Sequence, residues 1–191
     1  MSAIVESGSP DDYIFFSNRS AFGPQMDHWY DQFVDQLEKF PKIGMCGNTI
    51  NRPCPDDAEH TYKLHVQTYA FLTTLKHLGE FALTMPGEAA TSRQEAIEEG
   101  ELALSHRMFD KNLGLTSLAW PDHEFTSEDG DVDPELPCGN MTMIPGFEHV
   151  MGKLPFVHWH ESQTWKRFGW RSMLEFIDYR KNLLLDVFRG D

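Results

Sequence analysis

Glu101 is the residue of this 191-residue chain whose type and spacing favour chemistry most. It lies four residues after Ile97 and three before Leu104, and so falls within an apolar stripe at helical spacing. A carboxylate on the inward face of a helix loses hydration, which raises its pKa toward values suited to proton transfer. The alternative is a structural role, with Glu101 at the edge of the stripe and paired with Arg93 or His65.

Two histidines and an acidic segment are the candidates for metal binding. His158 and His160 alternate along an expected strand, which would turn both imidazoles to one side and favour a divalent metal. A polar surface strand is the alternative. Residues 121–140 form an acidic segment that contains Asp-Gly-Asp-Val-Asp. It lacks the spaced glycine and terminal glutamate of an EF-hand loop, so we expect a solvated loop there.

Asn18, Ser20 and Gly23 directly follow an apolar run, residues 13–16, that we expect to be a strand. Ligands bind in α/β proteins at the carboxyl ends of the strands, so these polar residues are candidates for substrate binding. An ordinary turn that ends in Gly23-Pro24 explains the same residues.

The elements that would position these residues alternate between strands and helices, which indicates one α/β domain over residues 1–191. We expect residues 1–12 to be flexible. The expected strands are 13–16 and 43–50, and the expected helices are 26–40, 66–83, 92–112 and 165–189.

The helix over 92–112 is the best delimited of these. Ser92 and Glu95 have the spacing of a capping box, and Gly114 is the expected stop. A glycine in a helix costs about 1 kcal/mol relative to alanine, which indicates a packing reason for Gly100. We therefore expect another group to approach the helix closely at this position.

Composition limits the classes of partner. The formal net charge is −14 and the basic residues are scattered, which argues against binding to nucleic acid or to an anionic membrane surface. No apolar run is long enough to span a bilayer, and the first residues do not resemble a secretory signal. Cys46, Cys54 and Cys138 cannot all pair within the chain, which favours a reducing compartment. We therefore expect a cytoplasmic protein.

Five motifs, in order along the chain, resemble those of a GT-A-fold glycosyltransferase family of the polysaccharide-biosynthesis type. The similarity ends near Leu118, and the motifs are Tyr13–Pro24, Ile43–Asn51, His65–Thr68, Glu95–Ile97 and Glu101–Ser105. In the first motif Asn18, Ser20, Gly23 and Pro24 match the family pattern, while Arg19 and Phe22 depart from it.

The resemblance implies a mixed sheet flanked by helices, a nucleotide-sugar donor and a glycan acceptor. It places Glu101 as the general base of an inverting enzyme, Asn18 and Ser20 near the donor diphosphate, and His65 and Gln67 in the acceptor cleft. Many relatives carry an Asp-x-Asp motif for Mn²⁺ or Mg²⁺ at the position of Asn18 and Ser20, where this chain has no carboxylate.

The similarity covers only the second, acceptor-side half of the family's domain, because residues 1–12 alone precede the first expected strand. The family's nucleotide-binding βαβ units would come before it. This departure fits a fragment or one piece of a split enzyme. It also fits a non-catalytic binding or scaffold protein, whose exposed sheet face would bind a partner chain or a second copy.

Overall fold

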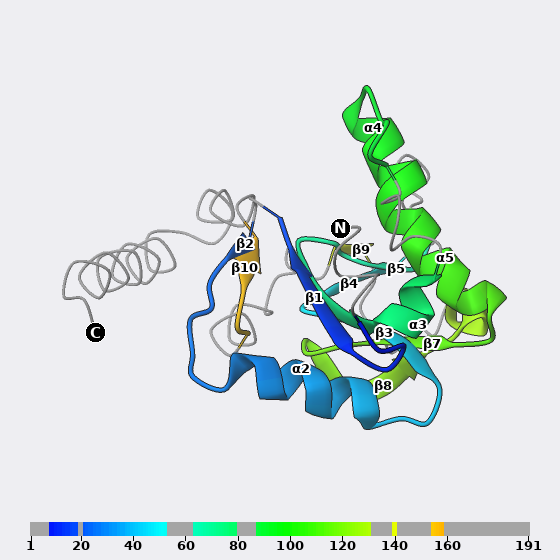
Figure 1. Ribbon diagram of the computed structural model, residues 1–191. Helices are drawn as coiled ribbons and strands as arrows, with labels where there is room; N and C mark the ends of the chain where they lie inside the picture. Colours follow the sequence, from blue (N-terminus) through cyan, green and yellow to red (C-terminus); the bar gives the residue numbers. More distant parts are fainter. Residues whose placement is uncertain are drawn as a thin grey trace, which may run out of the picture.

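The computed structural model describes residues 8–18, 21–52, 63–79, 87–130, 139–140 and 154–158. Their fold is α/β, with a mixed five-stranded sheet and helices packed against it (Figure 1). The predicted α/β class is therefore confirmed. No helix within these ranges combines the length and apolar character needed to cross a membrane.

The central sheet is mixed because one neighbouring pair of strands is parallel. Its order is β1 (Tyr13–Ser17), β6 (Ala70–Thr74), β3 (Ile43–Gly47), β7 (Gly114–Ser117) and β8 (Trp120–Phe125). β3 and β7 are parallel, and the other neighbours are antiparallel. The predictions of strands over 13–16 and in the first part of 43–50 are confirmed.

Two small sheets lie beside the central one. β4 (Ile50–Arg52) pairs with β5 (His65–Val66) on one side and with β9 (Gly139–Asn140) on the other. β2 (Ala21–Phe22) pairs with β10 (Val157–His158). Segments far apart in the sequence therefore meet next to the ends of β1 and β3.

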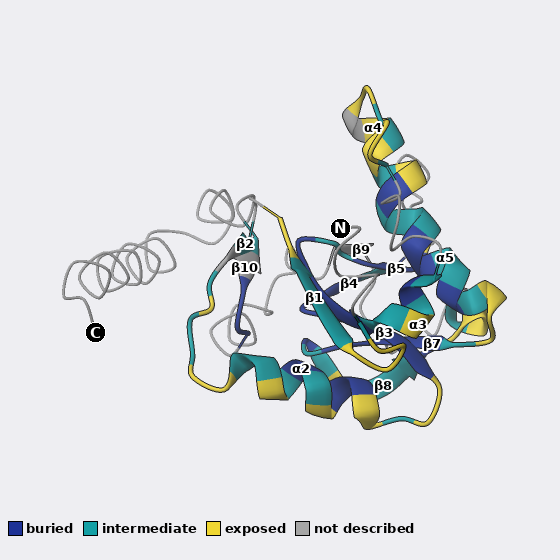
Figure 2. Cartoon of the chain, in the orientation of Figure 1, coloured by how far each residue is buried: buried dark blue, intermediate teal, exposed yellow. Residues whose placement is uncertain are grey.

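Helices cover both faces of the central sheet. α2 (Trp29–Glu38) buries Phe33 and Leu37 against one face, in a cluster with Leu72. α3 (Leu75–Leu78) and α5 (Ala103–Asp110) pack against the other face. Neighbouring residues of a strand point to opposite faces, so β6 sends Leu72 to the first cluster and Phe71 to the second. Figure 2 shows these elements buried along the sides that face the sheet.

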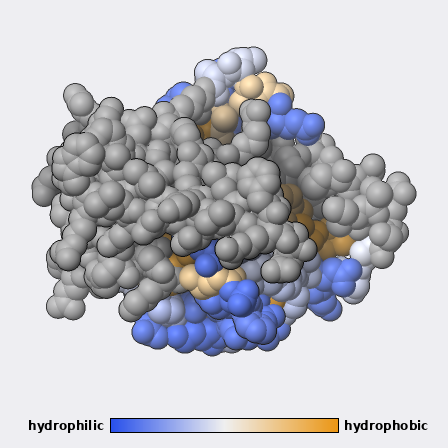
Figure 3. All heavy atoms as spheres, turned by 90° about the vertical axis from the view of Figure 1, so that its left-hand side faces the viewer, coloured by the Kyte–Doolittle hydropathy of each residue, from blue (hydrophilic) through white to orange (hydrophobic). Residues whose placement is uncertain are grey.

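α2 confirms the helix that was predicted over residues 26–40. Its outer side is acidic, since Asp31, Asp35 and Glu38 are exposed. Figure 3 shows hydrophilic side chains along the lower edge of the molecule, at the height of α2 in Figure 1. This helix is therefore amphipathic, as its spacing predicted.

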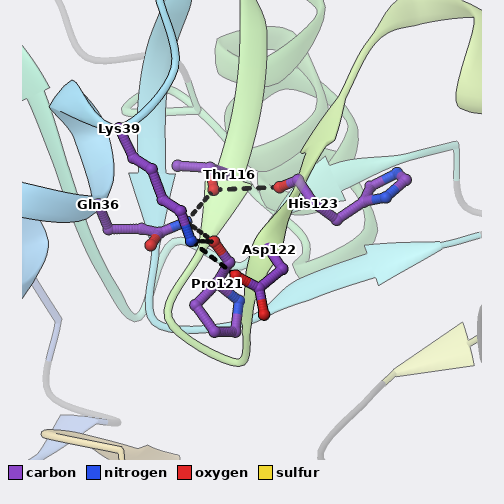
Figure 4. A network of polar contacts seen from close by, with 6 residues as sticks. All are labelled: Gln36, Lys39, Thr116, Pro121, Asp122 and His123. Atoms are coloured by element: carbon purple, nitrogen blue, oxygen red, sulfur yellow. Dashed lines mark hydrogen bonds and ion pairs between the residues drawn. The ribbon is translucent and has the colours of Figure 1, made fainter.

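A polar network joins α2 to the β7–β8 hairpin (Figure 4). Gln36 Nε2 donates to Thr116 Oγ1 over 2.6 Å and to Pro121 O over 3.0 Å. Lys39 Nζ donates to the same carbonyl and to Asp122 Oδ1. Gln36 is buried, so these bonds satisfy an amide that would otherwise be costly inside the protein.

The prediction of one helix over residues 66–83 is wrong for its first part. These residues form β5 and β6, and the helix α3 begins only at Leu75. Phe71, Leu75 and Leu78 do have helical spacing. However, Ala70–Thr73 lie between two other strands and are buried on both faces, and an apolar run of this kind has no period that distinguishes strand from helix.

The helix expected over 92–112 forms, but it is not a regular α-helix. It begins as α4 (Arg93–Glu95), continues as a π-helix, η2 (Ala96–Leu102), and ends as α5. In Figure 1 its α4 end points away from the sheet. Ser92 Oγ accepts the Glu95 N–H as predicted, whereas the Glu95 carboxylate bonds to Thr91 rather than to Ser92.

Gly114 does not stop this helix. Asn112 has the positive φ, 55°, and Gly114 already belongs to β7. A Cβ at Gly114 would lie 2.9 Å from Glu124 Oε1, an atom at the end of a flexible side chain, and 3.1 Å from Ile43 Cδ1.

The remaining segments differ from the expected ones or lie outside the described residues. The acidic segment 121–140 contains most of β8 and a 3₁₀ turn, η3 (Ser127–Gly130), instead of a continuous loop. Residues 9–12 are hydrogen-bonded to the start of α3 through Lys76 N–Pro10 O and Leu75 N–Asp12 O. The helix expected over 165–189 and residues 1–7 are outside the described ranges.

Candidate functional site

Glu101 lies on η2. Seven residues with π-helical bonding are unusual, and π-helical turns are frequent at functional sites. The wider turn rotates the side chains by a smaller angle per residue than an α-helix does. Leu104 and Met108 are buried as the stripe predicts, whereas Ile97 and Glu101 are half-buried. Glu101 therefore lies between core and solvent, with 29% of its side chain exposed.

His65, on β5, contacts the Glu101 carboxylate. Its Nε2 lies 3.7 Å from Glu101 Oε2, and its own side chain is only 2% exposed. The neighbours Leu64 and Val66 belong to the core cluster, which holds the strand in place. The structure thus brings together two residues that the sequence analysis named separately, as base and as acceptor-cleft residue. This contact is also the pairing named as the structural alternative for Glu101.

The protonation of His65 follows from its surroundings. Burial, with a smaller effect from His106, lowers the pKa of His65 to about 4, against the opposing effect of a hydrogen bond to the Lys63 backbone. His65 Nδ1 lies 2.6 Å from Lys63 O, and a carbonyl only accepts, so Nδ1 carries the ring proton. In the neutral ring Nε2 is therefore unprotonated. At neutral pH the contact joins an imidazole lone pair to Glu101 and is not an ion pair.

Ser105 fixes β5 against the helix that carries Glu101. The Val66 N–H donates to Ser105 Oγ over 3.0 Å, and both residues are fully buried. Ser105 was not predicted as a site residue on the basis of its own chemistry. The available signal was its position four residues after Glu101, since residues four apart share one face of a helix.

The backbone at Gly87 passes close to η2, and it can do so because neither Gly87 nor Gly100 carries a side chain. A Cβ on Gly87, whose φ is +75°, would lie 3.2 Å from Gly100 Cα and 3.3 Å from Ala96 O. Gly100 is buried. The expected close approach at Gly100 is confirmed, and the approaching group is the backbone at Gly87.

A second polar group, which we call the Tyr69 cluster, consists of Asn48, Thr49, Gln67 and Tyr69. Asn48 Nδ2 donates to Tyr69 Oη over 2.7 Å, and Thr49 Oγ1 donates to Gln67 Oε1 over 2.6 Å. Thr49 and Tyr69 hydroxyls lie 3.1 Å apart. The cluster is a continuous network of hydrogen bonds that reaches the Gln67 side chain.

Three of the predicted site residues contact the Tyr69 cluster or belong to it. Gln67 is a member, and the Asn18 N–H donates to Tyr69 O over 3.1 Å. The His158 ring packs against the Tyr69 ring at 4.9 Å between centroids. No sequence pattern pointed to Tyr69, because a lone aromatic residue after a short strand has no distinctive spacing.

Gly23 packs against Pro155 and Phe156, where a side chain would clash, and Phe156 in turn forms two hydrogen bonds with Asn48 of the Tyr69 cluster. Its peptide bond to Pro24 is cis. Ser20 and His160 are outside the described residues. Of the cysteines, Cys46 is buried and free, and Cys54 and Cys138 are likewise outside the described ranges.

The described residues do not form a cluster of metal ligands. Within them, no three His, Cys, Asp or Glu side chains gather at one point. His158 packs against an aromatic ring, and Asn18 supplies no carboxylate. Within the part of the chain that the structure describes, these residues offer no set of carboxylate ligands for Mn²⁺ or Mg²⁺.

Comparison of the chain with protein-family models, with curated proteins and with solved structures finds no match. Any statement about function therefore rests on the two polar groups just described, the His65–Glu101 pair and the Tyr69 cluster.

Proposed function

We propose that this chain is a glycosyltransferase-like protein of the GT-A type, with Glu101 as the general base. It would transfer a sugar from a nucleotide-sugar donor to a hydroxyl of a glycan acceptor, alone or as one piece of a split enzyme. The observation that carries the proposal is the placement of the Glu101 carboxylate, partly open to solvent and 3.7 Å from the unprotonated nitrogen of His65. A half-desolvated carboxylate beside a proton acceptor is suited to removing a proton from a hydroxyl.

In the proposed step the acceptor hydroxyl loses its proton to the Glu101 carboxylate. Its oxygen then bonds to the anomeric carbon of the donor sugar, and the bond from that carbon to the diphosphate breaks. The nucleoside diphosphate leaves with the bonding electrons.

The Tyr69 cluster would hold the substrates. Gln67 accepts a bond from Thr49 through its amide oxygen, so its amide nitrogen is the group left to donate to a sugar hydroxyl. Asn18, held by its backbone to Tyr69, would lie near the donor diphosphate together with Ser20. Amide and hydroxyl groups of this kind recognise sugars through directional hydrogen bonds.

Glu101→Gln tests the proposal. It keeps the size of the side chain but removes the base, so we expect a fall in the transfer rate of about 100-fold or more. The matched control is Glu99→Gln, because Glu99 is an exposed neighbour on the same π-helical segment. The assay measures donor hydrolysis and transfer with UDP- and GDP-sugars, and calorimetry measures binding of UDP and GDP. Equal activity in Glu101→Gln and wild type would remove Glu101 from the mechanism. The absence of both sugar transfer and nucleotide binding would overturn the proposal that this chain is an enzyme.

A second candidate is a non-catalytic binding or scaffold protein derived from such an enzyme. It is favoured by β1, which lies at an edge of the sheet and, within the described residues, pairs only with β6. Tyr13–Phe16 on this strand are half-buried. An edge strand of this kind accepts a strand from another chain. Light scattering that shows a monomer at all concentrations would count against self-association through this edge.

A further inference from the structure

His65 and Glu101 present acceptors to each other. Lys63 O holds the ring proton of His65 on Nδ1, so Nε2 offers a lone pair, and the facing atom is a carboxyl oxygen of Glu101. Two acceptors at 3.7 Å repel one another unless a proton lies between them. A proton on the Glu101 carboxyl group would turn this contact between two acceptors into one between a donor and an acceptor.

We propose that His65 is a positioning residue for Glu101, and that its Nε2 accepts a hydrogen bond from the Glu101 carboxyl group when that group carries a proton. The inference rests on the proposed function for the origin of the proton, which is the acceptor hydroxyl. The O–H bond of the acceptor breaks, the proton bonds to a Glu101 oxygen, and this new O–H donates to Nε2. Contacts of this type are often long in the free protein and shorten in the reacting complex.

The proton stays on Glu101 and does not move to His65. An imidazolium ion at a site that is 2% exposed would lose nearly all its hydration. Each element packed against β5 contributes to the surroundings of His65, and within the described residues β7 adds no titratable group. The charged or titratable side chains on the other elements are Cys46 on β3, Arg52 on β4, Glu98, Glu99 and Glu101 on η2, and His106, Arg107 and Asp110 on α5.

The first test does not depend on catalysis. Nitrogen NMR of the full chain distinguishes protonated from unprotonated ring nitrogens of each histidine. We expect His65 at pH 7 to be neutral, with its proton on Nδ1 and none on Nε2. A proton on Nε2 would overturn the inference, because that nitrogen would then donate to Glu101 and favour the ionised carboxylate.

The second test uses two substitutions that separate the ring nitrogens. His65→Asn places an amide near the position of Nδ1 and leaves nothing at Nε2, whereas His65→Gln reaches the Nε2 position with an amide oxygen. Carbon NMR should show the pKa of Glu101 falling by about one unit in His65→Asn, a tenfold loss of proton affinity, with partial recovery in His65→Gln. His65→Asn also leaves more empty volume than His65→Gln, so urea unfolding of both variants measures any general destabilisation separately from the pKa of Glu101. His28→Asn, at an exposed histidine, is the control that should leave the pKa of Glu101 unchanged.

The outcomes for the two proposals can be told apart. If the pKa of Glu101 falls in His65→Asn and partly recovers in His65→Gln but no sugar transfer is found, the positioning role of His65 stands and the proposed function fails. If transfer is found, the acid limb of its pH profile should move with the pKa of Glu101. Transfer with an unchanged pKa of Glu101 in His65→Asn would overturn the role of His65 alone.

Discussion

Two histidine–carboxylate pairs in this protein show how location decides what the same two groups can do. His28 Nδ1 lies 3.2 Å from Asp31 Oδ2 at the start of α2, with the side chains 84% and 68% exposed. His65 Nε2 lies 3.7 Å from Glu101 Oε2, with exposures of 2% and 29%. The first pair is surrounded by water, which screens the charges and solvates both partners. The second pair is enclosed by the core, so its protonation states depend on the protein.

The difference also lies in how the pairs form. His28 is the left-handed residue that precedes α2 and lies three residues before Asp31, so the local geometry of the helix start is sufficient to bring them together. His65 and Glu101 meet only because β5 packs against η2 and α5, and the Val66–Ser105 hydrogen bond holds that packing. The buried pair can therefore be disrupted at positions that belong to neither residue.

The largest expected effect is on the pH dependence of stability. His65 has a pKa of about 4 in the folded protein, against 6.5 for an ordinary histidine. The unfolded chain therefore binds the proton more tightly, and the folded state loses stability as pH falls from about 6.5 to about 4. The difference between the two pKa values corresponds to roughly 3 kcal/mol in the free energy of unfolding. His65 causes no further loss of stability below about pH 4.

Urea unfolding of wild type and His65→Gln at pH 7 and pH 4 measures this contribution. The variant should lose less stability than wild type over the interval, by roughly 3 kcal/mol. His28→Gln should keep the wild-type dependence, because its imidazole is exposed. If wild type and His65→Gln lose the same free energy of unfolding between pH 7 and pH 4, the buried histidine does not contribute to the pH dependence as proposed.

Ser105→Ala should act on the buried pair from outside it. The substitution leaves the Val66 N–H buried without its acceptor, which costs about 2 kcal/mol in the free energy of unfolding. Denaturant unfolding at pH 7 gives the value. Ser92→Ala is the matched control, since Ser92 also accepts a backbone N–H but at an exposed helix start, where about 1 kcal/mol is expected. A smaller loss for Ser105→Ala than for Ser92→Ala would contradict the importance given to this link.

Gly87→Ala should have a smaller effect, of about 1 kcal/mol or somewhat more. Its φ of +75° disfavours a side chain, and the added Cβ would press on Gly100 and Ala96 of η2. Thermal unfolding measures the loss. Glu88→Ala, at the exposed neighbouring position, should change stability little. If Gly87→Ala is as stable as wild type, the approach to η2 is not constrained at this point.

The smallest effect is expected at the exposed pair. Asp31→Asn removes the carboxylate beside His28 and should change the free energy of unfolding by about 0.5 kcal/mol or less, because exposed pairs are screened by solvent. Urea unfolding at low and high salt checks this value. A loss comparable with that of Ser105→Ala would remove the distinction between the two pairs.

Local patterns were sufficient for several elements. The short apolar run over residues 13–16 predicted β1. The three- and four-residue spacing of Trp29, Phe33, Leu37 and Phe40 predicted α2. Ser92 did mark a helix start. In each case the residues of the pattern are neighbours in the element they predict, so the pattern contains the physical cause.

The same reasoning failed where burial on both faces removed the pattern. Residues 70–73 of β6 are buried throughout, and their helical spacing to Leu75 and Leu78 misled the prediction. The π-helical bonding of η2 had no signal in the sequence either, and the packing of Gly87 against Gly100 joins segments whose contact no local pattern records.

By itself, the sequence determined that Glu101 lies on a helix beside an apolar stripe and that His65 and Gln67 follow one another in a short segment. Only the tertiary structure decided that His65 faces Glu101 and that Nε2 is the nitrogen it presents. The physical reason is that these facts depend on a backbone carbonyl, a buried serine and a π-helical turn. Their effects act through contacts between distant segments, which residue types and spacing do not record.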